Sequence, residues 1–204
     1  MTGNAPSTGD ERTALRRQLR ARRRAIQGTA RKRAAQLLAQ QVAAMHLLRP
    51  GRRIGLYLSM PEEIDTAPLL RLARERGCEI ALPRIISKRH DRMRFHEWNG
   101  EVRRGAYGIH EPRGGRMRSA RELDVVFLPL VGFDIQGNRI GMGRGFYDRH
   151  FAHRLRMTGY RRPLLIGIAY DVQMVAALPR AAHDVPLDAI VTESSIRRFQ
   201  GSTT

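Results

Sequence analysis

The stretch DVVFLPLVGFDIQGNRIGMGRGFYDRHF, residues 124–151, is the most informative part of the chain for its fold class. Its first part, residues 125–131, is continuously apolar, and such strands are covered on both faces, as in parallel sheets. It runs into glycines at alternate positions, Gly141, Gly143 and Gly145, and then into a segment expected to be helical. A buried strand, a glycine loop and a helix in this order indicate a layered α/β protein.

Segments on either side of this stretch continue the alternation of strands and helices. Further strands are expected at residues 54–58, 79–82, 93–98, 164–169 and 189–192. Helices are expected at residues 11–27, 29–48 and 66–76, the last capped by Asp65 or Thr66 and followed by Gly77. Residues 99–122, rich in Gly and Arg, are expected to form a long irregular connection. The pattern predicts a largely parallel central sheet with helices on both faces.

Length and composition predict a folded protein with one core. At 204 residues with 42% hydrophobic content, the chain can bury most of its apolar surface in a single domain, which we place at residues 11–197. Polar tails are expected at residues 1–10 and 198–204. Cys78 is the only cysteine, which excludes an intrachain disulfide and fits a cytoplasmic location. No run approaches the ~18 apolar residues of a membrane span, so no membrane partner is expected.

The chain carries a formal charge of +18, which attracts phosphates of nucleotides or nucleic acids. Four arginines form a stripe along the first predicted helix: Arg12, Arg16, Arg20 and Arg23. A nucleic-acid-binding protein that uses this helix is therefore the alternative from another functional class. Only Lys32 and Lys88 are lysines, so the arginine surplus can equally reflect the base composition of the genome.

The glycine loop is the best candidate for a phosphate site, because glycines let backbone amides approach an anion closely and a following helix adds its positive end. The glycines alone are explained more simply by a tight strand-to-helix turn that needs positive φ. Arg144 and Asp148 favour a phosphate site, since guanidinium matches phosphate oxygens and a carboxylate can hold Mg²⁺. Phe146 stands where a dinucleotide fingerprint needs glycine, and the Gly-Lys-Ser/Thr of a Walker loop is absent.

Several longer motifs occur in the order found in one enzyme family. They are YLSMPEEIDT at residues 57–66, LPR at 82–84, YGIHEP at 107–112, GNRIGMGRGFYDR at 137–149 and HDVPLDAIVTE at 183–193. Over residues 12–193 the sequence thus resembles the 5-formyltetrahydrofolate cyclo-ligase family, also called 5,10-methenyltetrahydrofolate synthetases. The resemblance implies a single-domain αβα sandwich related to sugar-phosphate isomerase and CoA-transferase folds.

The resemblance also implies roles for particular positions. ATP would be bound by Arg12, Thr13, Ala14, Leu15 and Arg16, and by Arg139, Ile140, Gly141, Met142, Gly143, Arg144, Gly145, Phe146 and Tyr147. The folate would be bound by Leu58, Glu63, Met142, Gly143, Arg144, Gly145 and Phe146. Arg144 and Tyr147 would act on the reacting groups, and Asp148 and Asp188 would hold Mg²⁺. Family members commonly carry Lys at the position of Arg12, and many carry Tyr at that of Phe146. Both departures keep the charge or the ring, so they bear on the detailed geometry of nucleotide binding more than on the reaction.

The implied reaction is the ATP-dependent conversion of 5-formyltetrahydrofolate to 5,10-methenyltetrahydrofolate, with release of ADP and phosphate. A formyl oxygen leaves poorly unless it is first phosphorylated, and phosphoryl transfer needs positioning and charge more than a protein nucleophile. Glu63 could accept hydrogen bonds from a pterin, although a glutamate just after Pro61 is more often a solvated loop residue. We expect a monomer with its site at the carboxyl ends of the strands.

Overall fold

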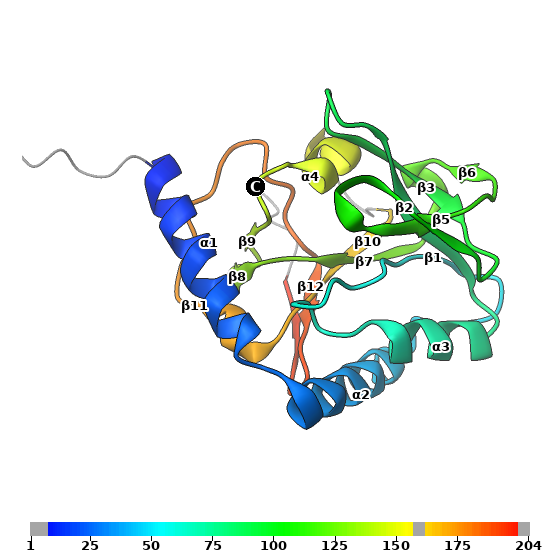
Figure 1. The fold of residues 1–204 in the computed structure, drawn as a ribbon, viewed down its shortest axis with the longest axis horizontal. Helices are drawn as coiled ribbons and strands as arrows, with labels where there is room; N and C mark the ends of the chain where they lie inside the picture. The colour runs from blue at the N-terminus through cyan, green and yellow to red at the C-terminus, as the bar shows by residue number, and fades with distance from the viewer. Residues whose placement is uncertain (1–7, 157–161, 200–204) are drawn as a thin grey trace, which may run out of the picture.

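The computed structural model describes residues 8–156 and 162–199, and its centre is an eight-stranded mixed sheet (Figure 1). The strand order is β13-β12-β10-β7-β1-β2-β3-β6. Strands β12, β10, β7, β1 and β2 run parallel, and β13, β3 and β6 pair antiparallel with their neighbours. The predicted α/β class with a largely parallel sheet is confirmed.

The elements have the following bounds. The strands of the central sheet are β1 Arg53–Gly55, β2 Glu79–Ser87, β3 Arg92–Glu97, β6 Met117–Arg118, β7 Val125–Pro129, β10 Leu164–Ile168, β12 Ala189–Val191 and β13 Ile196–Arg198. Two small sheets contain β4 Val102–Arg104 with β5 His110–Pro112, and β11 Met174–Val175 with β8 Gly132–Asp134 and β9 Arg139–Ile140. The α-helices are α1 Thr8–Arg24, α2 Gly28–Ala44, α3 Ala67–Glu75 and α4 Phe146–Phe151.

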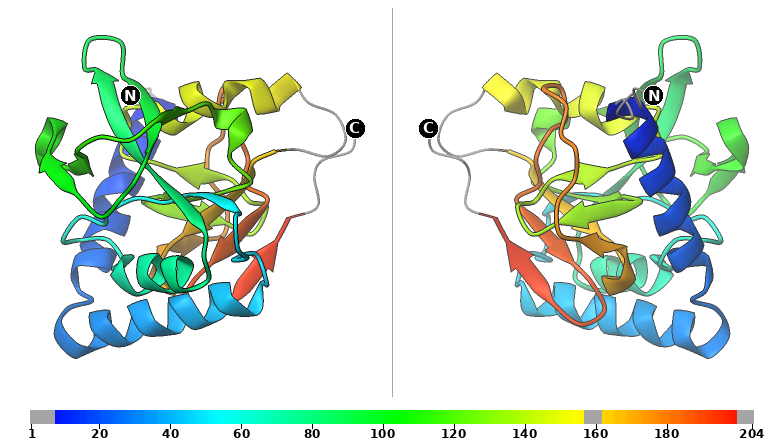
Figure 2. Two further views of the ribbon diagram at one scale, coloured as in Figure 1. Left: turned by 90° about the vertical axis from the view of Figure 1, so that its right-hand side faces the viewer. Right: turned by 90° about the vertical axis from the view of Figure 1, so that its left-hand side faces the viewer.

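Both faces of β7 are buried, as its apolar sequence predicts. Val125 and Phe127 belong to the core cluster beneath α2 and α3, whereas Val126 and Leu128 belong to the cluster that contains Phe151 of α4. Figures 1 and 2 show α2 and α3 on one side of the sheet and α4 on the other. Alternation along an extended strand sends successive side chains to opposite faces, so one short segment supports two cores.

Helix α1 lies against the β11-β8-β9 sheet at one side of the molecule (Figure 1). Leu19 is fully buried there with Val131 and Ile140, and Leu15 packs against the same cluster. This contact brings the first part of the chain beside the segment that leads into the glycine loop. No helix among the described residues is long and apolar enough to cross a membrane.

Several predicted boundaries differ from the structure. Helix α1 begins at Thr8, inside the predicted tail, and β13 extends to Arg198. Residues 1–7 and 200–204 of those tails lie outside the described residues. The predicted irregular connection over residues 99–122 contains β4, β5 and β6. These strands escaped prediction because they are short, and β4 is exposed on both faces and so lacks an apolar alternation.

The expectations for α3 are largely confirmed. Thr66 is the N-cap of the helix and makes no side-chain cap bond, whereas the carboxylate of Asp65, one residue earlier, accepts a hydrogen bond from the backbone N–H of Ala67 at 3.0 Å. Thr66 instead donates its hydroxyl to the backbone oxygen of Tyr57 at 2.7 Å. Gly77 follows Arg76, the C-cap of the helix. The cap and the hydroxyl bond together fix the loop between β1 and α3, whose residues border the candidate site.

Candidate active site

Two pockets meet at the glycine loop, residues 141–145. The first, which we call the basic pocket, has a volume of about 310 Å³. The second, the apolar pocket, has a volume of about 380 Å³ and is lined by residues that follow β1 and β7, including Leu58 and Leu130. The apolar pocket thus lies at the carboxyl ends of these two strands, as expected for an open α/β sheet.

The glycine loop connects β9 to α4 and has a backbone that favours glycine. Gly143 has φ +97° and Gly145 has φ +62°, a region in which a side chain would be strained. Arg16 of α1 donates from Nε to the backbone oxygen of Gly141 at 2.9 Å. The glycines therefore serve the turn, and the loop also forms the wall against which an arginine is placed.

The basic pocket combines arginines with carboxylates from distant parts of the chain. Its charged lining residues are Arg12, Arg16, Arg139, Asp148 and Asp184. Arg12 donates to both oxygens of the Asp184 carboxylate, at 2.8 and 3.3 Å. Arg139 donates to Oδ1 of Asp148, which also accepts from the backbone N–H of Val185. Three guanidinium groups against two carboxylates leave an excess positive charge, which suits an anionic ligand.

Asp184 was not singled out from the sequence. Burial alone would raise the pKa of this carboxyl, but the hydrogen bonds from Arg12 and from the Ala181 N–H hold the pKa below its ordinary value. Its position within HDVPLDAIVTE was the only available signal. The carboxylate stays charged and keeps Arg12 oriented at the edge of the basic pocket.

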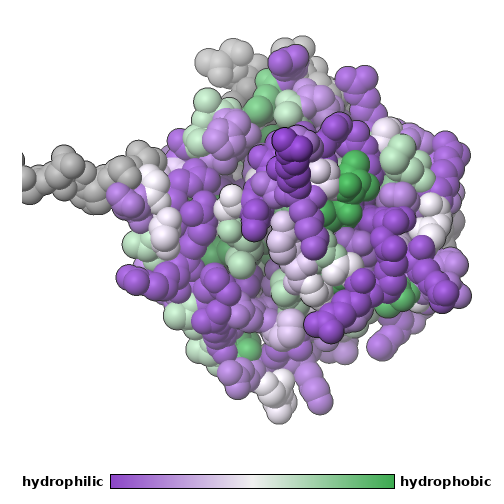
Figure 3. Space-filling view, turned by 45° about the horizontal axis from the view of Figure 1, so that its top comes forward, coloured by the Kyte–Doolittle hydropathy of each residue, from purple (hydrophilic) through white to green (hydrophobic). Residues whose placement is uncertain are grey.

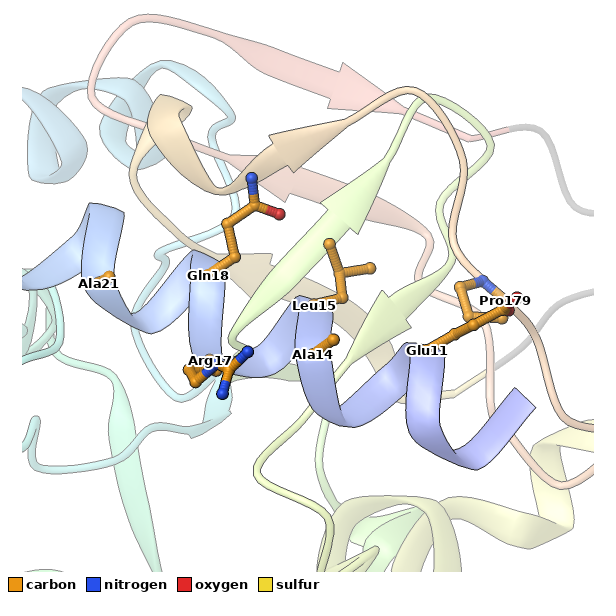
Figure 4. A pocket seen from close by; sticks show the side chains of 7 residues that line it. All are labelled: Glu11, Ala14, Leu15, Arg17, Gln18, Ala21 and Pro179. Carbon is orange, nitrogen blue, oxygen red and sulfur yellow. The ribbon is translucent and has the colours of Figure 1, made fainter. Parts of the chain in front are cut away.

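Only part of the predicted N-terminal ATP segment reaches the basic pocket. Arg12 and Arg16 line it, whereas Ala14 and Leu15 line a separate shallow groove along α1 (Figure 4). Thr13 donates its hydroxyl to the backbone oxygen of Gly9 within the same helix. Ile140, which belongs to the second predicted ATP-binding segment, is 1% exposed and lies in the apolar cluster that contains Leu19 of α1. A helix can direct only one face at a ligand, so the remaining positions serve packing.

The apolar pocket holds the predicted folate residues. Leu58, Glu63, Met142, Arg144, Gly145 and Phe146 all line it, together with Tyr147. Gly143 lines only the basic pocket. Apolar and aromatic side chains that were not predicted also contribute: Tyr57, Met60, Pro83, Ile85, Met93, Tyr107, Ile109 and Leu130. Such a lining with few polar groups is typical of sites for flat organic ligands.

Glu62 and Glu63 are neighbours in sequence with different environments. The Glu63 carboxylate accepts from the backbone N–H of Met60 at 2.9 Å and lies 3.9 Å from Arg23. Burial raises the pKa of Glu63 above its ordinary value. Glu62 lies within 4 Å of arginines on α1 instead, with Arg24 at 2.7 Å and Arg20 at 3.4 Å. Glu63 is thus not the solvated loop residue that its sequence context favours.

Arg144 and Tyr147 both line the apolar pocket, but their environments differ. Tyr147 is half-buried against the core cluster that contains Phe151, and desolvation, followed by the charge of Glu63, raises the pKa of its hydroxyl. Arg144 is 58% exposed, lies 3.7 Å from Asp91 and places its guanidinium 5.1 Å from the ring of Tyr107. Tyr147 thus packs against the core, whereas Arg144 is largely open to solvent.

The two predicted Mg²⁺ ligands do not line a common pocket. Asp148 lines both pockets, and Asp188 lines neither. Asp188 precedes β12 and accepts two hydrogen bonds of 2.7 Å from the buried Arg154, and a third from the N–H of Leu165. These bonds lie at the amino ends of β10 and β12. The turn-forming role that the sequence left open for Asp188 accounts for its contacts.

The arginine stripe of α1 faces the body of the protein. Arg12 and Arg16 point to the basic pocket, Arg20 binds Glu62, and Arg23 donates to the backbone oxygen of Leu130. Figure 3 shows a largely hydrophilic face with small hydrophobic patches. The helix that would carry nucleic-acid binding thus uses its stripe for internal contacts, which disfavours that alternative.

No group of three or more His, Cys, Asp or Glu side chains able to hold a metal occurs within residues 8–156 and 162–199. Asp148 is nevertheless a carboxylate at the border of a basic pocket. Mg²⁺ in nucleotide sites is commonly held by one or two carboxylates together with the substrate phosphates. The residues present fit a Mg²⁺ ion that arrives with a nucleotide.

Comparisons with known proteins agree with this geometry. A model described as the 5-formyltetrahydrofolate cyclo-ligase family matches residues 8–193. The 5-formyltetrahydrofolate cyclo-ligase of Mus musculus is 30% identical over 199 residues, or 94% of this chain and 98% of the relative. The 5-formyltetrahydrofolate cyclo-ligase of Escherichia coli K12 is 31% identical over 182 residues, or 87% of this chain and 98% of the relative.

The solved structure of a 5,10-methenyltetrahydrofolate synthetase from Aquifex aeolicus superposes with a TM-score of 0.80 at 26% identity, over 95% of each chain. The sequence match and the structural match both extend over nearly the whole chain, including the glycine loop and both pockets. The chain therefore belongs to the 5-formyltetrahydrofolate cyclo-ligase family.

Proposed function

We propose that the protein converts 5-formyltetrahydrofolate to 5,10-methenyltetrahydrofolate, using ATP and releasing ADP and phosphate. The observation that carries this function is the shared wall of the two pockets. Arg139, Gly141, Gly145 and Asp148 line both the basic and the apolar pocket. A phosphoryl donor on one side of the glycine loop would therefore lie next to an acceptor on the other, as in-line transfer requires.

The basic pocket is the proposed site for the ATP phosphates. Arg12 and Arg16 supply charge from α1, and the loop of residues 141–145 supplies backbone amides that can approach an anion. Asp148 would hold Mg²⁺, which supplies charge neutralisation for the phosphates when bound. Asp188 is retained only as the expectation from family resemblance, because its contacts support a structural role.

The apolar pocket is the proposed site for the folate. Glu63 would accept hydrogen bonds from the N–H groups of the pterin, while Leu58, Met142 and Phe146 would pack against the ring system. Water is a strong competitor for hydrogen bonds, and the low exposure of the Glu63 side chain, 12%, reduces that competition. The formyl group would then point towards the glycine loop and the phosphates.

The reaction has two bond exchanges. The formyl oxygen attacks the γ-phosphorus, the bond to ADP breaks, and an iminium phosphate forms. Nitrogen 10 then attacks the formyl carbon and loses its proton, the carbon–oxygen bond breaks, and phosphate leaves. Arg144 would stabilise the transferred phosphoryl group, and the Tyr147 hydroxyl, protonated at neutral pH, would act as a hydrogen-bond donor to the reacting groups.

A single assay tests the function. Purified protein with 5-formyltetrahydrofolate and Mg-ATP should form the methenyl chromophore, with one ADP for each product. Omission of ATP, or addition of EDTA, should abolish product formation. Equal product without nucleotide would contradict the proposal, and salt-sensitive RNA binding in place of turnover would favour the nucleic-acid alternative.

The finer assignments of fold and assembly are also proposals. We propose an αβα sandwich related to sugar-phosphate isomerase and CoA-transferase folds, with a single domain over residues 11–197. The helices on both faces of the sheet support this fold. A cytoplasmic monomer remains our expectation, and a mass measurement in solution tests the oligomeric state.

A further inference from the structure

A buried hydroxyl group at the floor of the apolar pocket lacks a partner. Tyr57 follows β1, lines the apolar pocket and is 4% exposed. Its Oη atom is buried and has no hydrogen-bond partner among the described residues. A buried polar group without a partner costs free energy, so a group of this kind in a ligand pocket calls for an explanation.

The surroundings of Tyr57 indicate which part of a ligand it would meet. Tyr57, Glu63 and Tyr147 all line the apolar pocket. Burial raises the pKa of Tyr57, and the charges of Glu63 and Tyr147 raise it further. The Glu63 carboxylate accepts from the backbone N–H of Met60, and the Tyr170 hydroxyl donates to the backbone oxygen of Glu63 at 3.4 Å. Tyr57 thus offers a neutral donor in the same pocket as the carboxylate proposed for the pterin.

The donors and acceptors along one edge of a pterin indicate which ligand atom the Tyr57 hydroxyl would meet, an inference that rests on the proposed folate site. A carboxylate that accepts from the 2-amino group and from N3–H of a pterin lies directly beside the 4-oxo oxygen, an acceptor. Glu63 is ionised when it accepts those bonds and cannot serve the oxo group, whereas a protonated phenol can. We propose that Tyr57 is a further substrate-binding residue whose hydroxyl donates a hydrogen bond to the 4-oxo oxygen of the pterin.

This role has a distinctive signature. Tyr57→Phe removes a hydroxyl that has no protein partner, so the free protein should keep its melting temperature or gain about 2–4 °C. The same substitution should weaken 5-formyltetrahydrofolate binding about tenfold, the value of one hydrogen bond of ~1.4 kcal/mol. Tyr170→Phe is the matched control for stability, because it deletes a hydroxyl that is bonded within the protein and should lower the melting temperature.

The test combines calorimetric binding of two ligands to the wild type and to Tyr57→Phe. The second ligand is the 4-thioxo analogue of 5-formyltetrahydrofolate, which keeps N3–H but offers a weak sulfur acceptor. We expect the tenfold difference between the two proteins with the oxo compound to shrink to about twofold with the thioxo compound.

Two results would overturn the inference: equal affinity of both proteins for the oxo compound, or an equal loss for both ligands. A fall in melting temperature as large as that of Tyr170→Phe would also contradict it, because the hydroxyl would then have a structural partner. If wild-type protein binds no 5-formyltetrahydrofolate at all, the proposed function fails instead.

Discussion

The basic and apolar pockets share a wall, but they shift the pKa values of Asp184 and Glu63 in opposite directions. In the basic pocket, bonds from Arg12 and from a backbone N–H lower the pKa of Asp184, so this carboxylate is charged and paired. In the apolar pocket, burial raises the pKa of Glu63, whose carboxylate lies 3.9 Å from the guanidinium of Arg23. The first pocket has its charged groups already paired, while the second contains groups that would gain partners from the proposed ligand.

Asp148 borders both pockets, and its substitution should have the largest effect. Asp148→Asn should lower kcat roughly 100- to 1,000-fold, because the proposed Mg²⁺ ligand is lost next to the transferred phosphoryl group. Steady-state kinetics over a range of Mg²⁺ concentrations measures this. A variant that keeps wild-type turnover and Mg²⁺ dependence would remove Asp148 from the proposed site.

Asp188→Asn provides the matched control. It weakens the paired bonds to the buried Arg154, so we expect the free energy of unfolding to fall by roughly 2–3 kcal/mol. The turnover of the protein that remains folded should depend on Mg²⁺ concentration in the same way as in the wild type. A changed Mg²⁺ dependence would instead support the metal-binding role that the family resemblance implies.

Glu63→Gln should weaken ligand binding in the apolar pocket and leave the basic pocket largely unchanged. It replaces one acceptor oxygen by a donor that faces the N–H groups of the pterin, so folate affinity should fall roughly 30- to 150-fold. ATP affinity should change little, since Glu63 lies outside the basic pocket. Calorimetry with each substrate separates these two effects.

Glu62→Gln is the neighbouring control, and the structure makes it informative. Glu62 binds Arg20, Arg23 and Arg24 on α1, so its substitution should loosen the helix that carries Arg12 and Arg16. We expect lower thermal stability and weaker ATP binding, with folate affinity nearly unchanged. Equal effects of both variants on folate binding would show that Glu63 has no particular role in the apolar pocket.

Arg16→Ala should affect only the basic pocket. The loss of one charged hydrogen-bonding group should raise the KM for ATP roughly tenfold or more, with a smaller change in the KM for the folate. Arg17→Ala is the control, because Arg17 is exposed and lines the groove outside the pocket (Figure 4). Normal ATP kinetics for Arg16→Ala together with lost RNA binding would revive the nucleic-acid alternative.

A fall in pH should have the smallest of these effects on ligand affinity, and it should act on the two pockets at different pH values. The raised pKa of Glu63 means that this carboxyl takes up a proton at a higher pH than Asp184, whose pKa is lowered. As pH falls, folate affinity should therefore weaken before the Arg12–Asp184 pair is lost, by about twofold where half of Glu63 is protonated. Binding titrations of each substrate from pH 7 to pH 4.5 measure the order, and simultaneous loss of both affinities would contradict it.

Much of the fold was predictable because the signals are local. The apolar run at residues 125–131 required cover on both faces, and helical periodicity identified α1, α2 and α3. The strands β4, β5 and β6 carried no comparable pattern, since they are short and partly exposed. Family resemblance supplied half of the residues that line the apolar pocket, but it gave no reason to separate Asp188 from Asp148.

By itself, the sequence determined the α/β class, the glycine loop and family membership, because strands, turns and motifs depend on residues close together in the chain. Only the tertiary structure decided which side chains form the pocket walls. Arg12 and Asp184 are 172 residues apart and become partners only when α1 packs beside the glycine loop. The roles proposed for Tyr57 and Glu63 likewise depend on burial, which every segment packed around them contributes to.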